Sequence, residues 1–210
     1  MVNRCDAVSS RVVNEGTRAL RSDAERTVRT ILEAAERVFA EDPAASMEQI
    51  AEAAGVARTT VHRRFASREA LLEALSTVAA REFAAAVDAA HPETTPPLVA
   101  LYQVTVNVLQ VKRQWPFALD LVGPGDGEWV RAHADVERRC DHLLRRAQES
   151  GVLRADADLA WAKWVIYALI GVAARMRECE PDAAATRVVD MLLCGVGTGQ
   201  GLTRTGPEAG

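Results

Sequence analysis

The chain has 210 residues, of which 49% are apolar, 26% are charged and only 5% are aromatic. This length allows one or two domains with a buried core that needs no disulfide or metal for support. The sequence contains 38 alanines against 13 glycines and 8 prolines. Alanine has the lowest cost in a helix, whereas strands favour β-branched and aromatic residues. The composition therefore predicts an all-α fold and argues against an all-β one.

A net charge of −4 argues, as a whole-chain average, against nucleic acid as a partner, but an average can hide a local basic patch. The four cysteines form no CxxC pair, which indicates reduced thiols. No apolar run reaches the roughly 18 residues that span a bilayer. The polar start of the chain lacks the apolar segment of a signal peptide. We therefore expect a cytoplasmic protein with no membrane partner.

The two ends of the chain differ from the middle in composition. Residues 1–22 mix Arg, Ser, Asn and Gly without a sustained period, which predicts a flexible basic arm. Residues 197–210 are rich in Gly and Thr and are expected to be disordered. Residues 23–41 have apolar positions at steps of three and four, the pattern of an amphipathic helix.

Three more helices are predicted before residue 91. Ser46 and Gln49 have the spacing of a capping box, which begins a second helix that Gly55 ends. A third helix is expected over residues 57–65. Ser67 is placed to cap a long fourth helix that reaches about residue 90.

Five further helices are expected in the rest of the chain. Asp156 and Asp182 are the predicted caps of the last two. We expect a first domain over residues 23–68 and a helical bundle over residues 69–196. The five helices are predicted at residues 97–113, 115–122, 128–150, 157–178 and 183–194.

Residues 47–64 have the pattern of a helix-turn-helix. Ala51 is small where two helices would cross, and Gly55 permits a left-handed turn conformation. Once the apolar positions Ile50, Val56 and Val61 are buried between the helices, the third helix must turn its remaining side chains outward. Residues 57–68 hold four arginines, one histidine and no acid, so the local basic patch exists.

This patch suits DNA, because arginine can bond two acceptors on guanine and threonine offers a hydroxyl and a methyl to base edges. Arg68, behind the capping Ser67, is placed to meet a phosphate together with free backbone amides. The alternative is an amphipathic hairpin with a solvated basic face. The predicted DNA-binding residues are Ser46, Arg58, Thr59, Thr60, His62, Arg63, Arg64 and Arg68.

The run from Gly55 to Leu71, GVARTTVHRRFASREAL, resembles the TetR family signature G-V-S-x-x-T-[LV]-Y-x-[HY]-F-x-[SN]-K-[ED]-x-L. The resemblance covers about residues 23–75. It implies a helix-turn-helix DNA-binding domain followed by a helical domain for ligand binding and dimerisation. It also implies a homodimeric repressor that a small-molecule effector releases from a palindromic operator.

The sequence departs from the signature at four positions. Ala57 stands where the family has a capping Ser or Thr, a loss of about 1 kcal/mol of helix capping. His62 replaces the Tyr that in the family contacts the DNA backbone, Arg64 replaces His or Tyr, and Arg68 replaces Lys. These changes suggest an altered operator preference.

The bundle offers candidates for a ligand pocket and for a dimer interface. Polar and aromatic residues among the apolar ones could line a pocket, although aromatics at helical spacing also pack as ordinary core. The predicted pocket residues are Tyr102, Asn107, Trp115, Phe117, Trp129, His133, Trp164 and Tyr167. The last two predicted helices are apolar around much of their circumference, as a dimer interface or a core would be. The predicted interface residues are Trp161, Ala168, Gly171, Val172, Val188 and Leu192.

Two other classes of protein were considered. His133, Glu137 and Asp141 share one helix face, near Cys140 and His142, as metal ligands of an enzyme could. Interleaved arginines favour an ion-paired surface instead, and no nucleophile or nucleotide motif is present. A helix-turn-helix used only as an interaction module is the other alternative. We predict a DNA-binding regulator that is not an enzyme and uses no metal or cofactor, with operator DNA, an effector and a second copy as partners.

Overall fold

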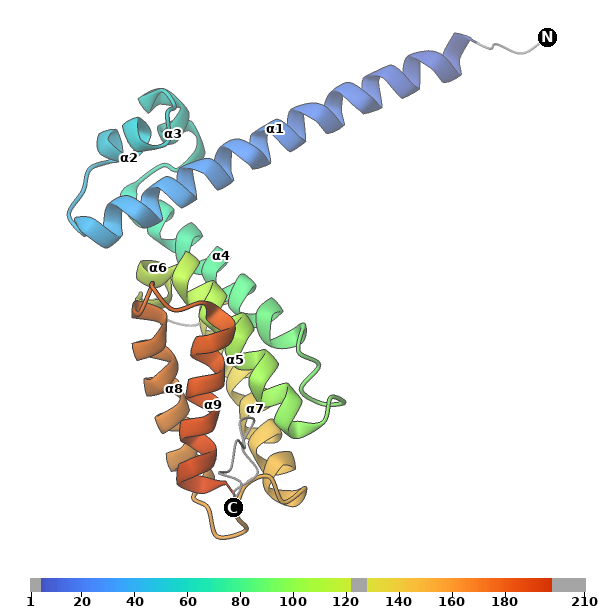
Figure 1. Cartoon of the computed structure of the whole chain (residues 1–210). Coiled ribbons are helices and arrows are strands. Elements are labelled where there is room, and N and C mark those ends of the chain that lie inside the picture. Colours follow the sequence, from blue (N-terminus) through green and yellow to red (C-terminus); the bar gives the residue numbers. More distant parts are fainter. Residues whose placement is uncertain (1–4, 122–127, 198–210) are drawn as a thin grey trace. The chain divides into compact units, whose positions relative to one another are not determined.

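The computed structural model describes residues 5–121 and 128–197, and its described residues form nine α-helices and no named strand (Figure 1). The predicted all-α fold is confirmed. The chain divides into two compact units, residues 1–75 and 76–210. The division falls inside the fourth helix, seven residues beyond the predicted boundary at residues 68 and 69.

The first unit begins with α1, Cys5–Glu41. This helix starts well before the predicted start at residue 23, so the prediction of an unstructured arm is wrong for residues 5–22. The reason is that Arg, Glu, Ala and Leu in this segment are good helix formers, and that a single Gly does not stop a helix. Polar composition alone did not distinguish a helix from a coil.

The rest of the first unit is the predicted three-helix arrangement. α2 is Met47–Ala53, α3 is Arg58–Arg64, and α4 is Arg68–Asp88. α2 packs against both α1 and α3. The large side chains Phe39, Ile50 and Val61 from these three helices are fully buried, as is Leu71 from the first turn of α4.

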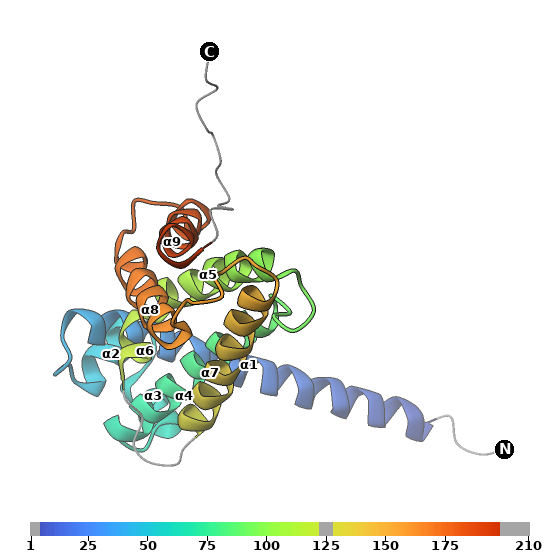
Figure 2. The ribbon, with the colours of Figure 1, turned by 90° about the horizontal axis from the view of Figure 1, so that it is seen from below.

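The second unit is a helical bundle built around α5. Seen along the bundle in Figure 2, α5 lies among α7, α8 and α9, and it packs against all three. Eight of its side chains are buried, because apolar residues lie around most of its circumference. The elements of this unit are the part of α4 from Ser76 onward, α5 (Pro97–Gln114), α6 (Pro116–Asp120), α7 (Glu128–Glu149), α8 (Leu159–Arg175) and α9 (Pro181–Val196).

Two predicted helix caps are corrected. The cap of α8 is Asp158 and not Asp156, because the carboxylate of Asp158 accepts the backbone N–H of Trp161 at 3.0 Å. α9 begins with Pro181 in its first turn, where a missing N–H costs nothing, so Asp182 lies inside the helix rather than capping it.

Candidate functional site

The turn between α2 and α3 has the predicted local structure. Ser46 and Gln49 form the capping box, with the Ser46 Oγ accepting the Gln49 N–H at 3.3 Å. Gly55 has a φ of +66°, the left-handed conformation that favours glycine. The N–H groups of Gly55 and of the following residue return to carbonyls of α2 in a Schellman motif. These local bonds fix the direction in which the chain enters α3.

α3 presents a basic outer face. Its inner residue Val61 is fully buried, while Thr60 is half-buried at the edge of the core. No side chain caps its N-terminus, because the N-cap residue Ala57, although it has the extended backbone of a cap, carries no side-chain acceptor. The side chains exposed on α3 are those of Arg58, Thr59, His62, Arg63 and Arg64.

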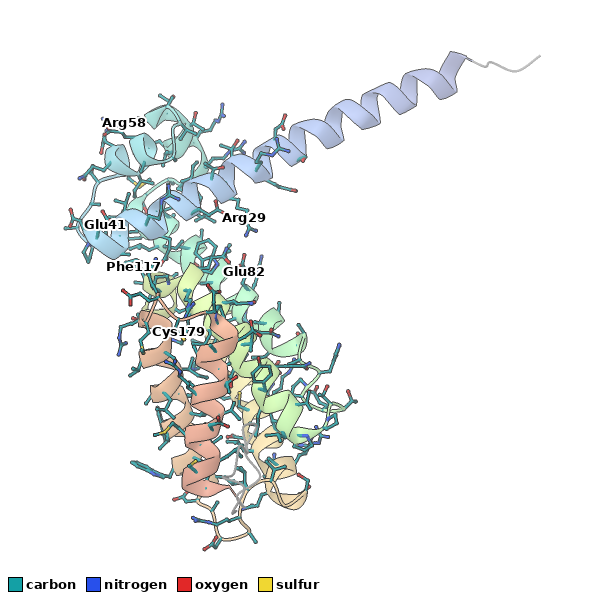
Figure 3. All side chains as sticks on the ribbon, in the orientation of Figure 1. Arg29, Glu41, Arg58, Glu82, Phe117 and Cys179 are labelled. Carbon is teal, nitrogen blue, oxygen red and sulfur yellow. The ribbon has the colours of Figure 1, made fainter. Side chains whose placement is uncertain are left out.

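Arg58 lies at the start of α3 (Figure 3). Two neighbouring side chains hold it there. Its Nη2 lies 2.6 Å from Oε1 of Glu48 on α2, and its Nε donates to Nε2 of His62 one turn later at 3.4 Å. The pKa of Glu48 is lowered, mainly by a backbone hydrogen bond, with further contributions from Arg58 and Ser46 that act against the opposing effect of desolvation. Glu48 is not among the residues that the sequence predicts for this site. Its position in the first turn of α2 was the available signal.

Two predicted DNA-binding residues have bonds within the first unit. Ser46 is exposed, but its hydroxyl is used in the capping box. Arg68 is half-buried and donates to the backbone carbonyl of Pro43, and its guanidinium lies 4.9 Å from the ring centroid of Phe39. Arg68 therefore ties the start of α4 to α1 and to the loop that follows it. Ser67 caps α4, as predicted, by accepting the N–H of Ala70 at 3.2 Å.

The second unit contains a cavity of about 180 Å³. Apolar side chains from α4, α5, α7 and α8 form most of its wall, including Phe83, Val104, Leu144 and Ile170. Two of the predicted pocket residues, His133 and Tyr167, line it. The remaining polar lining residues are Thr105, Lys112 and Cys140.

Burial raises the pKa of two of these lining groups, which favours their uncharged forms. It raises the pKa of the Tyr167 hydroxyl well above its usual range, with a further contribution from Cys140. Burial is also the main cause of the raised pKa of the Cys140 thiol. The hydroxyl of Thr105 donates to the carbonyl of Leu101 at 2.7 Å, one turn earlier on α5. The cavity is therefore mostly apolar, and its basic lining residues are Lys112 and His133.

Most of the other predicted pocket residues lie outside this lining. The Tyr102 hydroxyl donates to Asp182 at 3.0 Å, and the Asn107 amide donates to the carbonyl of Ala86 at 2.9 Å. Trp115 is fully buried, and its Nε1 donates to Glu82 at 2.6 Å.

Three more predicted pocket residues remain. Phe117 is half-buried on α6, and Trp164 is 65% exposed, with its ring centroid 6.5 Å from that of Tyr167. The side chain of Trp129 lies outside the described residues. Aromatic character alone therefore did not identify the residues around the cavity.

α8 and α9 together expose an apolar surface. Trp161 and Trp164 are each 65% exposed, and Val172, Met176 and Met191 are at least half exposed. Ala168 is also exposed and Gly171 is half-buried. We call this set the α8–α9 face.

Two predicted interface residues on α9 belong to the core of the second unit. Val188 is 4% exposed and Leu192 is 2% exposed, so their assignment to a surface is wrong. α9 is apolar on more than one side, and the sequence did not distinguish the side that packs against α5 and α8.

The face of α7 considered for a metal is occupied by ion pairs. Lys163 Nζ lies 2.8 Å from Asp141, and His133 Nε2 lies 3.9 Å from Glu137. Arg139 pairs with Asp135 at 2.9 Å and with Asp88. Across the described ranges, no group of three or more His, Cys, Asp or Glu side chains could hold a metal ion. In the same part of the chain, no helix is long and apolar enough to cross a membrane.

Comparison with known proteins gives consistent results. Residues 31–75 match the model of the bacterial regulatory proteins of the tetR family. The HTH-type transcriptional repressor LfrR of Mycolicibacterium smegmatis is 42% identical over 87 residues, which are 41% of this chain and 46% of the repressor. That sequence match thus spans less than half of the relative.

Solved structures match over a longer part of the chain. The crystal structure of the TetR-like regulator LfrR from Mycobacterium smegmatis in complex with proflavine matches this chain with a TM-score of 0.64 and 28% sequence identity. The match covers 82% of this chain and 98% of that one. The crystal structure of the TetR family regulator PfmR from Thermus thermophilus matches with a TM-score of 0.64 and 23% sequence identity, over 83% of this chain and 99% of that one. At this identity the match supports the fold alone. These relatives are transcriptional regulators.

Proposed function

We infer that the chain is a member of the TetR family of bacterial regulatory proteins, and we propose that it is a ligand-responsive DNA-binding regulator of transcription that acts as a homodimeric repressor. The observation that carries this proposal is the exposed basic face of α3, set on a correctly formed helix-turn-helix turn. Nothing in this proposal requires catalysis.

In this proposal α3 enters the major groove. Arg58 and Arg63 are exposed and can reach guanine edges or phosphates, and Thr59 can contact a base edge or a phosphate. An arginine has five N–H donors, and the bonds of Arg58 to Glu48 and His62 use two of them. Glu48 and His62 would therefore orient Arg58 without consuming its capacity to bind a base.

The other predicted DNA-binding residues take lesser or structural roles. Arg64 is exposed at the end of α3 and supports phosphate contact. Two residues would contribute to DNA binding from the rim of the interface. They are Thr60, at the edge of the core, and Ser46, which caps α2. Arg68 would have a structural role and would fix α4 to α1, because its contacts with the Pro43 carbonyl and the Phe39 ring lie within the first unit.

The second copy is proposed to dock on the α8–α9 face. A monomer that left two tryptophans, a valine and two methionines on neighbouring helices in water would expose an unusually apolar patch. The small Ala168 and Gly171 would let a partner helix approach closely. A two-fold dimer would present two copies of α3 to a palindromic site.

The cavity is proposed to bind the effector. Ala80, Phe83 and Val87 of α4 line it, and the first turns of the same helix, through Leu75, belong to the helix-turn-helix unit. An effector that binds better when α4 adopts one position would shift the population toward that position and lower the affinity for DNA.

Selection of DNA from a random library by the purified full chain tests the DNA-binding role. We expect enrichment of a palindromic sequence and a footprint over both half-sites. Enrichment of no sequence, with only weak salt-sensitive binding, would favour the interaction-module alternative and would contradict the proposal.

A further inference from the structure

The size of the cavity limits what it can bind. Its volume is about 180 Å³. A buried apolar cavity of about 150 Å³ in another protein admits one benzene molecule. The cavity in this chain therefore has room for a single aromatic ring with one small substituent. Its wall contains aromatic and branched aliphatic side chains suited to a flat apolar body, such as Phe83, Val104, Val108 and Ile170.

The charges in the lining have one sign. Among the described residues around the cavity, none is acidic, whereas Lys112 and His133 are basic. Tyr167 and Cys140 remain neutral, as burial raises the pKa of each. Glu137 and Asp141 of α7 are not part of this lining and lie 3.9 Å from His133 and 2.8 Å from Lys163, respectively. A cationic ligand would therefore meet no carboxylate in the described lining itself, and the cost of burying an uncompensated charge is large.

Lys112 differs from the other basic residues near it. Lys163 is paired with Asp141 at 2.8 Å. Arg113, the next residue on α5, donates to the backbone carbonyls of Met176 and Cys179 at 3.2 and 2.6 Å. Within the residues that the structure describes, Lys112 makes no ion pair or hydrogen bond with a protein group while it lines the cavity. Its ammonium group is the donor that an anionic ligand would need.

We propose that the effector is a small aromatic carboxylate, with its ring among the apolar side chains of the cavity and its carboxylate on the Lys112 ammonium. This inference rests on the proposed function, because it names the chemical class of the effector. Benzoate has the required ring and charge. Benzamide and benzamidine have nearly the same shape as benzoate, but benzamide is neutral and benzamidine is positively charged. Comparing the three compounds therefore separates the effect of ligand charge from that of ligand size.

Calorimetric titration of the full chain with these three compounds tests the proposal. We expect benzoate to bind at least tenfold more tightly than benzamidine, since a charge-assisted hydrogen bond contributes enough for about a tenfold change in Kd. Lys112→Met should weaken benzoate about tenfold and leave benzamide unchanged. Lys163→Met, which removes the same charge outside the lining, should leave both affinities unchanged. Thermal unfolding of each variant checks that it is folded.

Several results would overturn the inference. They are benzamidine binding as tightly as benzoate, no binding of benzoate at millimolar concentration, or equal benzoate affinity in Lys112→Met and the wild type. Loss of the preference for benzoate in His133→Gln but not in Lys112→Met would also refute the role of Lys112. DNA selection without any ligand tests the proposed function separately, so a regulator with another class of effector would be recognised.

Discussion

Replacing Ala57 by serine is expected to stabilise the protein, because α3 begins at a residue that has the backbone of an N-cap but no side-chain acceptor. Ala57 has φ −64° and ψ 143°, and its carbonyl already accepts the N–H groups of Thr60 and Val61 at 2.8 and 3.3 Å. A serine hydroxyl at this position can accept a free N–H of the first turn without a change of backbone.

The start of α2 gives the reference for the size of this effect. Ser46 has a similar backbone, φ −84° and ψ 162°, and its hydroxyl makes the bond that Ala57 lacks. Exchange of a capping serine and alanine changes the free energy of unfolding by about 1 kcal/mol. For a chain of this size, that amount corresponds to about 2–4 °C in Tm. We therefore expect Ala57→Ser to raise Tm, and Ser46→Ala to lower it, by about this much.

Thermal and urea unfolding of the full chain, followed by circular dichroism, measure both changes. Ala40→Ser, at an exposed position inside α1, is the control, because serine there makes no cap and should cost only about 0.5 kcal/mol. An Ala57→Ser protein that is no more stable than the wild type, beside a clear loss in Ser46→Ala, would refute the reasoning about α3.

Three further predictions concern other parts of the structure. Trp115→Phe should cost about 2–3 kcal/mol in urea unfolding, because it removes a buried indole whose N–H donates to the Glu82 carboxylate at 2.6 Å, and a loss below about 0.5 kcal/mol would contradict this. Val172→Glu on the α8–α9 face should give a monomeric mass by light scattering while the exposed Ala155→Glu keeps the dimer, and an unchanged dimer in Val172→Glu would contradict the proposed interface. The pKa of Glu48 is lowered in the folded state, so its ionised form adds stability that is present above the ordinary value of 4.5 and is lost as pH falls below it. Unfolding between pH 7 and pH 3 should therefore depend less on pH in Glu48→Gln than in the wild type, and identical profiles would reject this role.

The features that the sequence predicted well depend on short-range signals. The capping box of Ser46 and Gln49, the left-handed Gly55 and the burial of Val61 each depend on residues a few positions apart. Such signals fix the helix-turn-helix before any tertiary contact is known. The exposure of Arg58 and its neighbours then follows from the burial of the opposite face.

The features that it missed depend on which helix faces meet in the bundle. Trp115, between α5 and α6, and Tyr167 of α8 are both aromatic, but only Tyr167 lines the cavity. Val188 is buried and Met191 is exposed on the same apolar helix, a difference set by the packing of α9 on α5 and α8. Lys112 was not identified because one lysine in an amphipathic helix gives no pattern.

The central claim, that α3 reads DNA through its basic face, is tested most directly by a mobility-shift titration of Arg58→Ala on the selected palindrome at fixed salt. Arg154→Ala is the matched control, since Arg154 is an exposed arginine of the second unit, 3.3 Å from Asp156. A bidentate arginine–base contact contributes about 1–3 kcal/mol, so Arg58→Ala should bind at least fivefold more weakly and discriminate less between the palindrome and scrambled DNA. Arg154→Ala should bind as the wild type does. Equal affinity and equal discrimination in Arg58→Ala and the wild type would contradict the claim.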